Sequence, residues 1–108
     1  MRDFGINVVA TQEGETMLYQ LAIHRPKPEH EQDLIDSMHR FGVAAREQGA
    51  IEAHTFKDER SDALVGLAIW RSDDELTAAR PALAAATEDD DFDAWESGPV
   101  ELFMLHDV

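Results

Sequence analysis

The sequence contains no cysteine, few basic residues and no long hydrophobic run. Without cysteine, disulfides and thiol chemistry are excluded. Only 9 Lys and Arg residues stand against 23 Asp and Glu residues, which leaves a formal net charge of −14. Such a chain lacks the basic stripe that displaces counterions from nucleic acids, and it is unsuited to anionic membrane surfaces. We therefore expect neither nucleic acid nor membrane among its partners.

The length of 108 residues fits one domain. We predict an N-terminal arm over residues 1–16, with a candidate strand at residues 6–10, and a single domain over residues 17–108. The first residues lack the apolar stretch of a signal peptide, so we expect a cytoplasmic protein. Seven arginines against two lysines, with abundant Ala, Asp and Glu, are typical of a GC-rich bacterial source.

A central apolar stretch occupies residues 63–70, with the sequence Ala-Leu-Val-Gly-Leu-Ala-Ile-Trp. It has no polar side chain on either face, which is typical of a strand covered on both sides. Residues 51–57 alternate between two faces and are joined to it by the polar residues 58–62. So short a connection predicts an antiparallel hairpin.

Three further segments are predicted from their hydrophobic patterns. Residues 17–24 form a strand that a proline-rich turn ends, because proline cannot donate to a strand ladder. Residues 29–48 carry apolar residues at spacings of three and four and are followed by Gly49, which predicts a helix. Residues 100–106 are apolar on both faces and predict the last strand.

A second helix is predicted to begin after Ser72, which has the capping-box spacing to the Glu three residues later. Pro81 removes a helix hydrogen bond, so we expect either a kink or two short helices. The acidic run 88–93 is expected to be a solvated loop that does not pack. Phe92 and Trp95 are expected to form a short helical turn that docks back onto the domain.

The order β-α-β-β-α-β predicts an α+β, ferredoxin-like fold with a four-stranded antiparallel sheet and two helices on one face. The other face would expose several large apolar side chains. At about 1.5–3 kcal/mol for each, the uncovered face would forfeit on the order of 10 kcal/mol, which is comparable to the stability of a whole domain. We therefore predict a homodimer in which two sheets face each other.

The chain resembles the antibiotic biosynthesis monooxygenase-like domains over roughly residues 17–108. The motifs that carry the resemblance are Ile23-His24 at a strand end, Lys27-Pro28-Glu29 at the start of a long helix, Gly49, and Val65-Gly-Leu-Ala-Ile-Trp-Arg-Ser72. The resemblance implies a dimeric α/β barrel and a small cofactor-independent monooxygenase that acts on aromatic or quinol-type substrates. Some members bind haem through an Asn on the first strand and a His in the second helix, and neither residue is present in those elements here. We therefore expect no cofactor.

Two histidines are candidate catalytic bases, because the pKa of histidine lies near neutrality. His54 shares a strand face with Glu52 and Phe56, and it would accept a proton from a phenolic substrate. The alternative is a solvated or hydrogen-bonded histidine without catalytic function. His24 shares a face with Gln20, and the two would hold a ligand oxygen if that face borders a pocket. The alternative for His24 is a position on the surface rim.

Four residues are candidates for binding a small aromatic substrate: Trp70, Gln20, Phe56 and Phe103. Trp70 would form the wall of a pocket, and its alternative is a core or interface aromatic, since large aromatic residues dominate cores. Strand alternation alone does not tell which candidates share a side with Trp70, because the register between strands is unknown.

The sequence predicts no metal site. His30 and His39 are nine residues apart and do not form the i, i+4 pair of helical metal sites. The acidic run lacks the alternating ligands and the glycine of a calcium loop. The resemblance and the candidate residues leave two functions open: a cofactor-independent oxygenase, and a non-catalytic ligand-binding dimer of the same fold.

Overall fold

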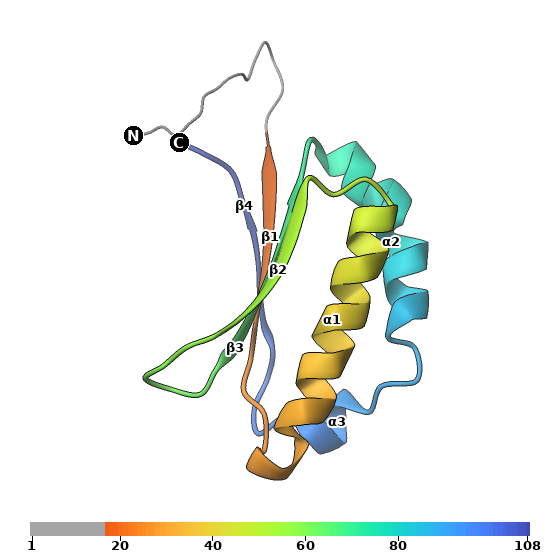
Figure 1. Cartoon of the computed structure of the whole chain (residues 1–108). Coiled ribbons are helices and arrows are strands. Elements are labelled where there is room, and N and C mark those ends of the chain that lie inside the picture. The colour runs from red at the N-terminus through yellow and green to blue at the C-terminus, as the bar shows by residue number, and fades with distance from the viewer. Residues whose placement is uncertain (1–16) are drawn as a thin grey trace.

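The computed structural model describes residues 17–108 (Figure 1). The predicted arm at residues 1–16, with its candidate strand at residues 6–10, lies outside the described residues. The order of elements is β1 (Leu18–His24), the short 3-10 helix η2 (Pro28–His30), α1 (Glu31–Glu47), β2 (Glu52–Lys57), β3 (Leu64–Trp70), α2 (Asp73–Ala86), α3 (Phe92–Trp95) and β4 (Glu101–Leu105). This order confirms the predicted ferredoxin-like fold.

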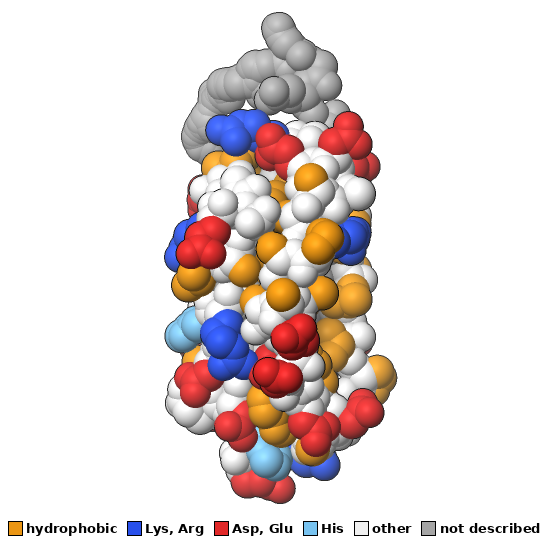
Figure 2. Space-filling model, turned by 90° about the vertical axis from the view of Figure 1, so that its right-hand side faces the viewer, with side chains coloured by type: hydrophobic (Ala, Val, Ile, Leu, Met, Phe, Trp, Pro, Cys, Tyr) orange, Lys and Arg blue, Asp and Glu red, His pale blue; other side chains and the backbone are white. Residues whose placement is uncertain are grey.

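The four strands form one antiparallel sheet in the order β2-β3-β1-β4. Figure 1 shows α1 and α2 side by side on one face of this sheet, and no described helix on the other. We call these the helix face and the open face. Figure 2 views the molecule from the helical side, where acidic and basic side chains are spread among apolar ones. Within residues 17–108, no helix combines the length and the hydropathy needed to cross a membrane.

The two long helices begin and end at the predicted signals. Gly49 follows α1 with a φ of +106°, a conformation that glycine adopts without strain. The hydroxyl of Ser72 caps α2 by accepting a hydrogen bond from the Glu75 N–H at 3.2 Å. Pro81 lies within α2, which runs unbroken from Asp73 to Ala86, so two separate helices were the wrong expectation. Pro81 is exposed, as is Thr77, and water can therefore reach the carbonyl that the proline leaves unpaired.

The core of the helix face consists of two clusters at opposite ends of β3. Fully buried Trp70 lies in one cluster, together with Leu18 and the α2 residues Leu76 and Leu83. The other cluster packs Leu64 against Leu34 and Met38 of α1, and Phe92 and Trp95 cover it from outside. The predicted docking of the short aromatic helix is thereby confirmed. Between Leu64 and Trp70, the helix face of β3 carries only Gly66 and Ala68, and Ala68 belongs to the Trp70 cluster.

The open face carries the large apolar side chains that the sequence predicts there. The strand register places these residues on it: Tyr19, Leu21, Ile23, Phe56, Val65, Leu67, Ile69, Phe103 and Leu105. Phe56, Phe103 and Leu105 are 49%, 40% and 43% exposed. So large an apolar surface is typical of an interface rather than of a monomer surface.

Candidate functional site

A cavity of about 270 Å³ lies on the helix face, between the sheet and α1. Its floor is built from small residues on three adjacent strands, since Ala22 pairs with Gly66 and Ala53 pairs with Ala68. Its roof includes Met38 and Phe41 of α1. A Cβ atom added to Gly66 would lie 3.2 Å from Met38 Cε, which is closer than an ordinary contact, so the glycine gives the Met38 methyl group room in the roof.

The candidate residues His24 and Gln20 both line this cavity. They lie on the same face of β1, with Ala22 between them. At about 3.3 Å per strand residue, their Cα atoms are roughly 13 Å apart. Gln20 lies toward the Trp70 end of the sheet and His24 toward the Leu64 end, so the two polar side chains bracket an apolar floor.

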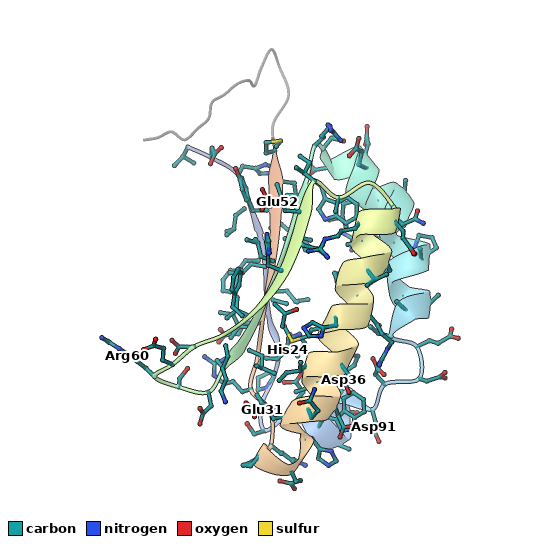
Figure 3. All side chains as sticks on the ribbon, viewed as in Figure 1. His24, Glu31, Asp36, Glu52, Arg60 and Asp91 are labelled. Carbon is teal, nitrogen blue, oxygen red and sulfur yellow. The ribbon has the colours of Figure 1, made fainter. Side chains whose placement is uncertain are left out.

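A buried carboxylate fixes His24, which is labelled in Figure 3. Nδ1 of His24 lies 2.5 Å from Oε2 of Glu96, and Oε1 of Glu96 accepts a hydrogen bond from the backbone N–H of Arg25 at 3.0 Å. The side chains of His24 and Glu96 are only 13% and 6% exposed. A carboxylate accepts hydrogen bonds, so Nδ1 donates in this pair. In the neutral imidazole, Nε2 then keeps its lone pair and can accept a proton from a ligand.

The polypeptide around Glu96 is paired with the end of β1, which holds this carboxylate in place. Lys27 N–H donates to Trp95 O at 2.8 Å, and Ser97 N–H donates to Arg25 O at 2.7 Å. The ring of Phe92 lies 6.2 Å from the ring of His24. Our reading of the sequence missed Glu96, because 72 positions separate it from His24 and only the docking of the aromatic helix hints at its place.

At the other end of the floor, Trp70 holds Gln20. The indole Nε1–H donates to Oε1 of Gln20 at 3.0 Å. An indole nitrogen can only donate, so the orientation of the Gln20 amide is determined and its Nε2 group is left as a donor. Within residues 17–108, no hydrogen-bond partner is recorded for that Nε2 group. Trp70 itself is fully buried in the core and affects the cavity through Gln20.

One acidic residue of the run 88–93 is packed, contrary to our expectation of a wholly solvated loop. The side chain of Asp90 is 7% exposed and accepts hydrogen bonds of 2.5 Å from Ser37 Oγ and from Arg40 Nη2. Both donors belong to α1, so this contact attaches the segment after α2 to the roof of the cavity. The neighbouring Thr87 and Phe92 line the cavity from this segment.

The strand register places the side chains of the remaining candidates on the open face, although residue His54 also borders the cavity. The side chain of His54 pairs with Glu52 at 2.8 Å and stacks on Phe56 with ring centroids 5.7 Å apart. Phe103 pairs with Leu21, another open-face residue. The structure therefore brings Gln20, His24 and Trp70 to one side of the sheet and leaves His54, Phe56 and Phe103 on the other. The assignment of the latter three residues to the site stays a prediction. No group of three or more side chains suited to a metal ion occurs among the described residues.

Comparisons with known proteins identify the fold. No protein-family model matches the sequence, and no curated protein matches it. Rv0793 from Mycobacterium tuberculosis is 16% identical, with a TM-score of 0.73 over 85% of this chain and 95% of that protein. A candidate antibiotic biosynthesis monooxygenase from Nitrosomonas europaea is 7% identical, with a TM-score of 0.73 over 91% and 96% of the two chains.

A solved structure of an antibiotic biosynthesis monooxygenase is 14% identical to this chain, with a TM-score of 0.69 over 84% of this chain and 98% of that one. At these identities the likeness concerns the fold. The chain therefore has the same α+β fold as these antibiotic biosynthesis monooxygenase structures.

Proposed function

We propose that this chain is a small cofactor-independent oxidoreductase that uses molecular oxygen to oxidise an aromatic or quinol-type substrate in the cavity. The observation that carries the proposal is the buried pair of His24 and Glu96 at the edge of an apolar space. A mostly apolar pocket with a few oriented polar groups is the usual form of a small-molecule site. The fold that the chain shares with monooxygenase structures supports the same class of reaction.

In the proposed reaction, Nε2 of His24 removes a proton from a phenolic or ring CH₂ group. Glu96 holds the imidazole in place and stabilises the positive charge that develops on it. The deprotonated ring is electron-rich and adds O₂ to form a peroxide anion, which takes the proton back from the His24 imidazolium to become a hydroperoxide. At a ring CH₂ group, loss of water from this hydroperoxide leaves a carbonyl. One oxygen atom enters the product, the other leaves as water, and O₂ is the sole oxidant.

The apolar walls serve this reaction by excluding water from the reacting ring. Ala22, Ala53, Gly66 and Ala68 offer a flat floor, and Phe41 contributes to the roof. Burial also strengthens the electrostatic interaction between Glu96 and the imidazolium, because the local dielectric is low.

The test is oxygen consumption by metal-stripped protein with a panel of anthrone-like and quinol substrates. We expect uptake that requires the protein and falls by about 100-fold or more in His24→Ala, which is the usual contribution of a general base. His54→Ala tests the second candidate base, and His39→Ala, an exposed residue of α1, is the control. Uptake that survives His24→Ala would refute the assignment of the base.

A non-catalytic ligand-binding module is the second candidate function. The observation that favours it is the cavity itself, whose apolar floor and oriented Gln20 amide would hold a ligand without any chemistry. Tight binding of an aromatic ligand with no protein-dependent oxygen uptake would favour this function over the first.

We also propose that two copies of the chain associate through their open faces. The occupant of that face is a second copy, because the apolar face spans all four strands and a two-fold axis would cover it with the same surface of another chain. The described residues that point out of it are aliphatic or aromatic near its centre, where Leu67 pairs with Leu21, and polar near β2, where Glu52 and His54 lie. This is the usual arrangement of an apolar interface core with a polar rim.

A further inference from the structure

We infer that the cavity selects an elongated, flat ligand by both of its ends, with a hydroxyl group at His24 and a hydrogen-bond acceptor such as a ketone at Gln20. The inference rests on the proposed function in that it places the ligand in the same cavity. It goes further in naming the ligand's polarity and its direction in the site.

The direction of the ligand in the cavity follows from the hydrogen-bonding group that is available at each end. Nδ1 of His24 is engaged by Glu96, so the neutral ring presents an acceptor, Nε2, and matches a ligand O–H group. Oε1 of Gln20 is engaged by Trp70, so the amide presents a donor, Nε2, and matches a ligand carbonyl. The two ends therefore differ in kind, and a ligand with two identical ends would satisfy only one of them.

The shape of the space sets the body of the ligand. The floor between the two ends consists of Ala22 and its neighbours Gly66 and Ala68, none of which projects beyond a methyl group. The ends are separated by about 13 Å at the level of the Cα atoms, and the side chains of His24 and Gln20 shorten the gap. The volume of about 270 Å³ lies at the lower limit of ordinary ligand pockets, which suits two or three fused rings.

The charge of the lining excludes ionic ligand ends. Among residues 17–108, no Lys or Arg lines the cavity. The carboxylates of Glu96 and Asp90, which contact the lining residues His24 and Ser37, are already paired. A carboxylate or phosphate placed at the Gln20 end would lose its hydration without meeting a cation. The ends of the ligand are therefore neutral hydrogen-bonding groups.

The experiment measures equilibrium binding under anaerobic conditions, where no turnover occurs. The probes form a matched set on one ring frame: naphthalene, 2-naphthol, 2-acetylnaphthalene and 6-acetyl-2-naphthol. We expect each polar group to improve binding by about 3- to 10-fold, the usual net worth of one hydrogen bond, so that 6-acetyl-2-naphthol binds most tightly. Equal binding of all four ligands would overturn the inference.

Two variants locate the ends. Gln20→Glu keeps an acceptor for the Trp70 indole but replaces the donor Nε2 with an oxygen, so it removes the gain from the acetyl group and leaves the gain from the hydroxyl. His24→Phe keeps an aromatic ring but has no acceptor nitrogen, so it removes the gain from the hydroxyl and leaves the gain from the acetyl group. His39→Ala is the control for both. A Gln20→Glu variant that loses the hydroxyl gain instead would refute the direction.

This test separates the inference from the proposed function. If oxygen uptake is absent but the four ligands bind in the expected order, the oxygenase proposal fails and the inference stands. If uptake is present but the ligands bind equally, the inference fails and the proposed function stands.

Discussion

Replacing Glu96 with glutamine tests the arrangement on which the candidate site depends. The Glu96 carboxylate accepts two hydrogen bonds, one from the Arg25 backbone N–H at 3.0 Å and one from His24 Nδ1 at 2.5 Å. A glutamine side chain has only one acceptor oxygen. In Glu96→Gln, one of the two donors must therefore face an NH₂ group.

The size of the effect follows from the burial of this pair. The Glu96 side chain is 6% exposed, so water does not replace the lost acceptor. A buried donor without a partner costs about 1–3 kcal/mol of unfolding free energy. If the amide NH₂ faces His24, it donates to Nδ1 and moves the ring proton to Nε2. That tautomer cannot accept a proton from the substrate, and the rate should fall by about 10²- to 10⁴-fold, the range that general bases contribute.

Two measurements check this prediction. Urea unfolding reports the loss of stability, and ¹⁵N NMR of the imidazole reports which ring nitrogen carries the proton in the neutral form. Glu101→Gln is the matched control. Glu101 pairs with Arg25 at 3.6 Å with both side chains about half exposed, and such surface pairs contribute roughly 0–1 kcal/mol. Unchanged stability, an unchanged tautomer and full activity in Glu96→Gln would refute the reasoning.

The remaining predictions concern the cavity and the open face. Gly66→Val should displace the Met38 side chain, because the added Cβ atom alone would lie 3.2 Å from Met38 Cε, so the cavity should change shape and naphthol binding should weaken by more than about 10-fold. Unchanged affinity would place the ligand elsewhere. Leu67→Asp should dissociate the proposed dimer, whereas Val43→Asp on exposed α1 should not. Gel filtration with light scattering measures both, and a monomeric wild type at micromolar concentration would refute the dimer.

Most of the fold could be predicted because it depends on local patterns. The apolar run at residues 63–70 and the alternation at residues 17–24 define two strands within one residue of their observed ends. Gly49 and Ser72 mark a helix end and a helix start through backbone chemistry that acts within a few residues. Pro81 left either a kink or two short helices open, and the structure has one helix, since the exposed position of Pro81 makes the loss of one hydrogen bond tolerable.

The site could be predicted only in part, because it depends on contacts between distant residues. Gln20 and His24 share a face by strand alternation, and the sequence shows this. Gln20 and His24 lie on the same face of β1 as Leu18, and Leu18 pairs with Trp70 on the helix face. No local sequence pattern specifies this pairing between strands. Because the register between strands is not readable from the sequence, His54 and His24 were equally good candidate bases before the structure was known. The contact between His24 and Glu96 arises only when the segment after α2 docks.

The apolar burial that the helix face gives up at the cavity can be offset by burial of the open face. Ala22, Ala53, Gly66 and Ala68 create the cavity, and in doing so they give up apolar burial at the centre of the helix face. Each large side chain missing there forgoes about 1.5–3 kcal/mol. The open face holds the large aliphatic and aromatic residues that the helix face lacks. Covering them in the proposed dimer would offset the loss, so a hollow site on one face is best tolerated when the other face is buried. Leu67→Asp, which should separate the subunits, should therefore lower the unfolding free energy by more than Val43→Asp does.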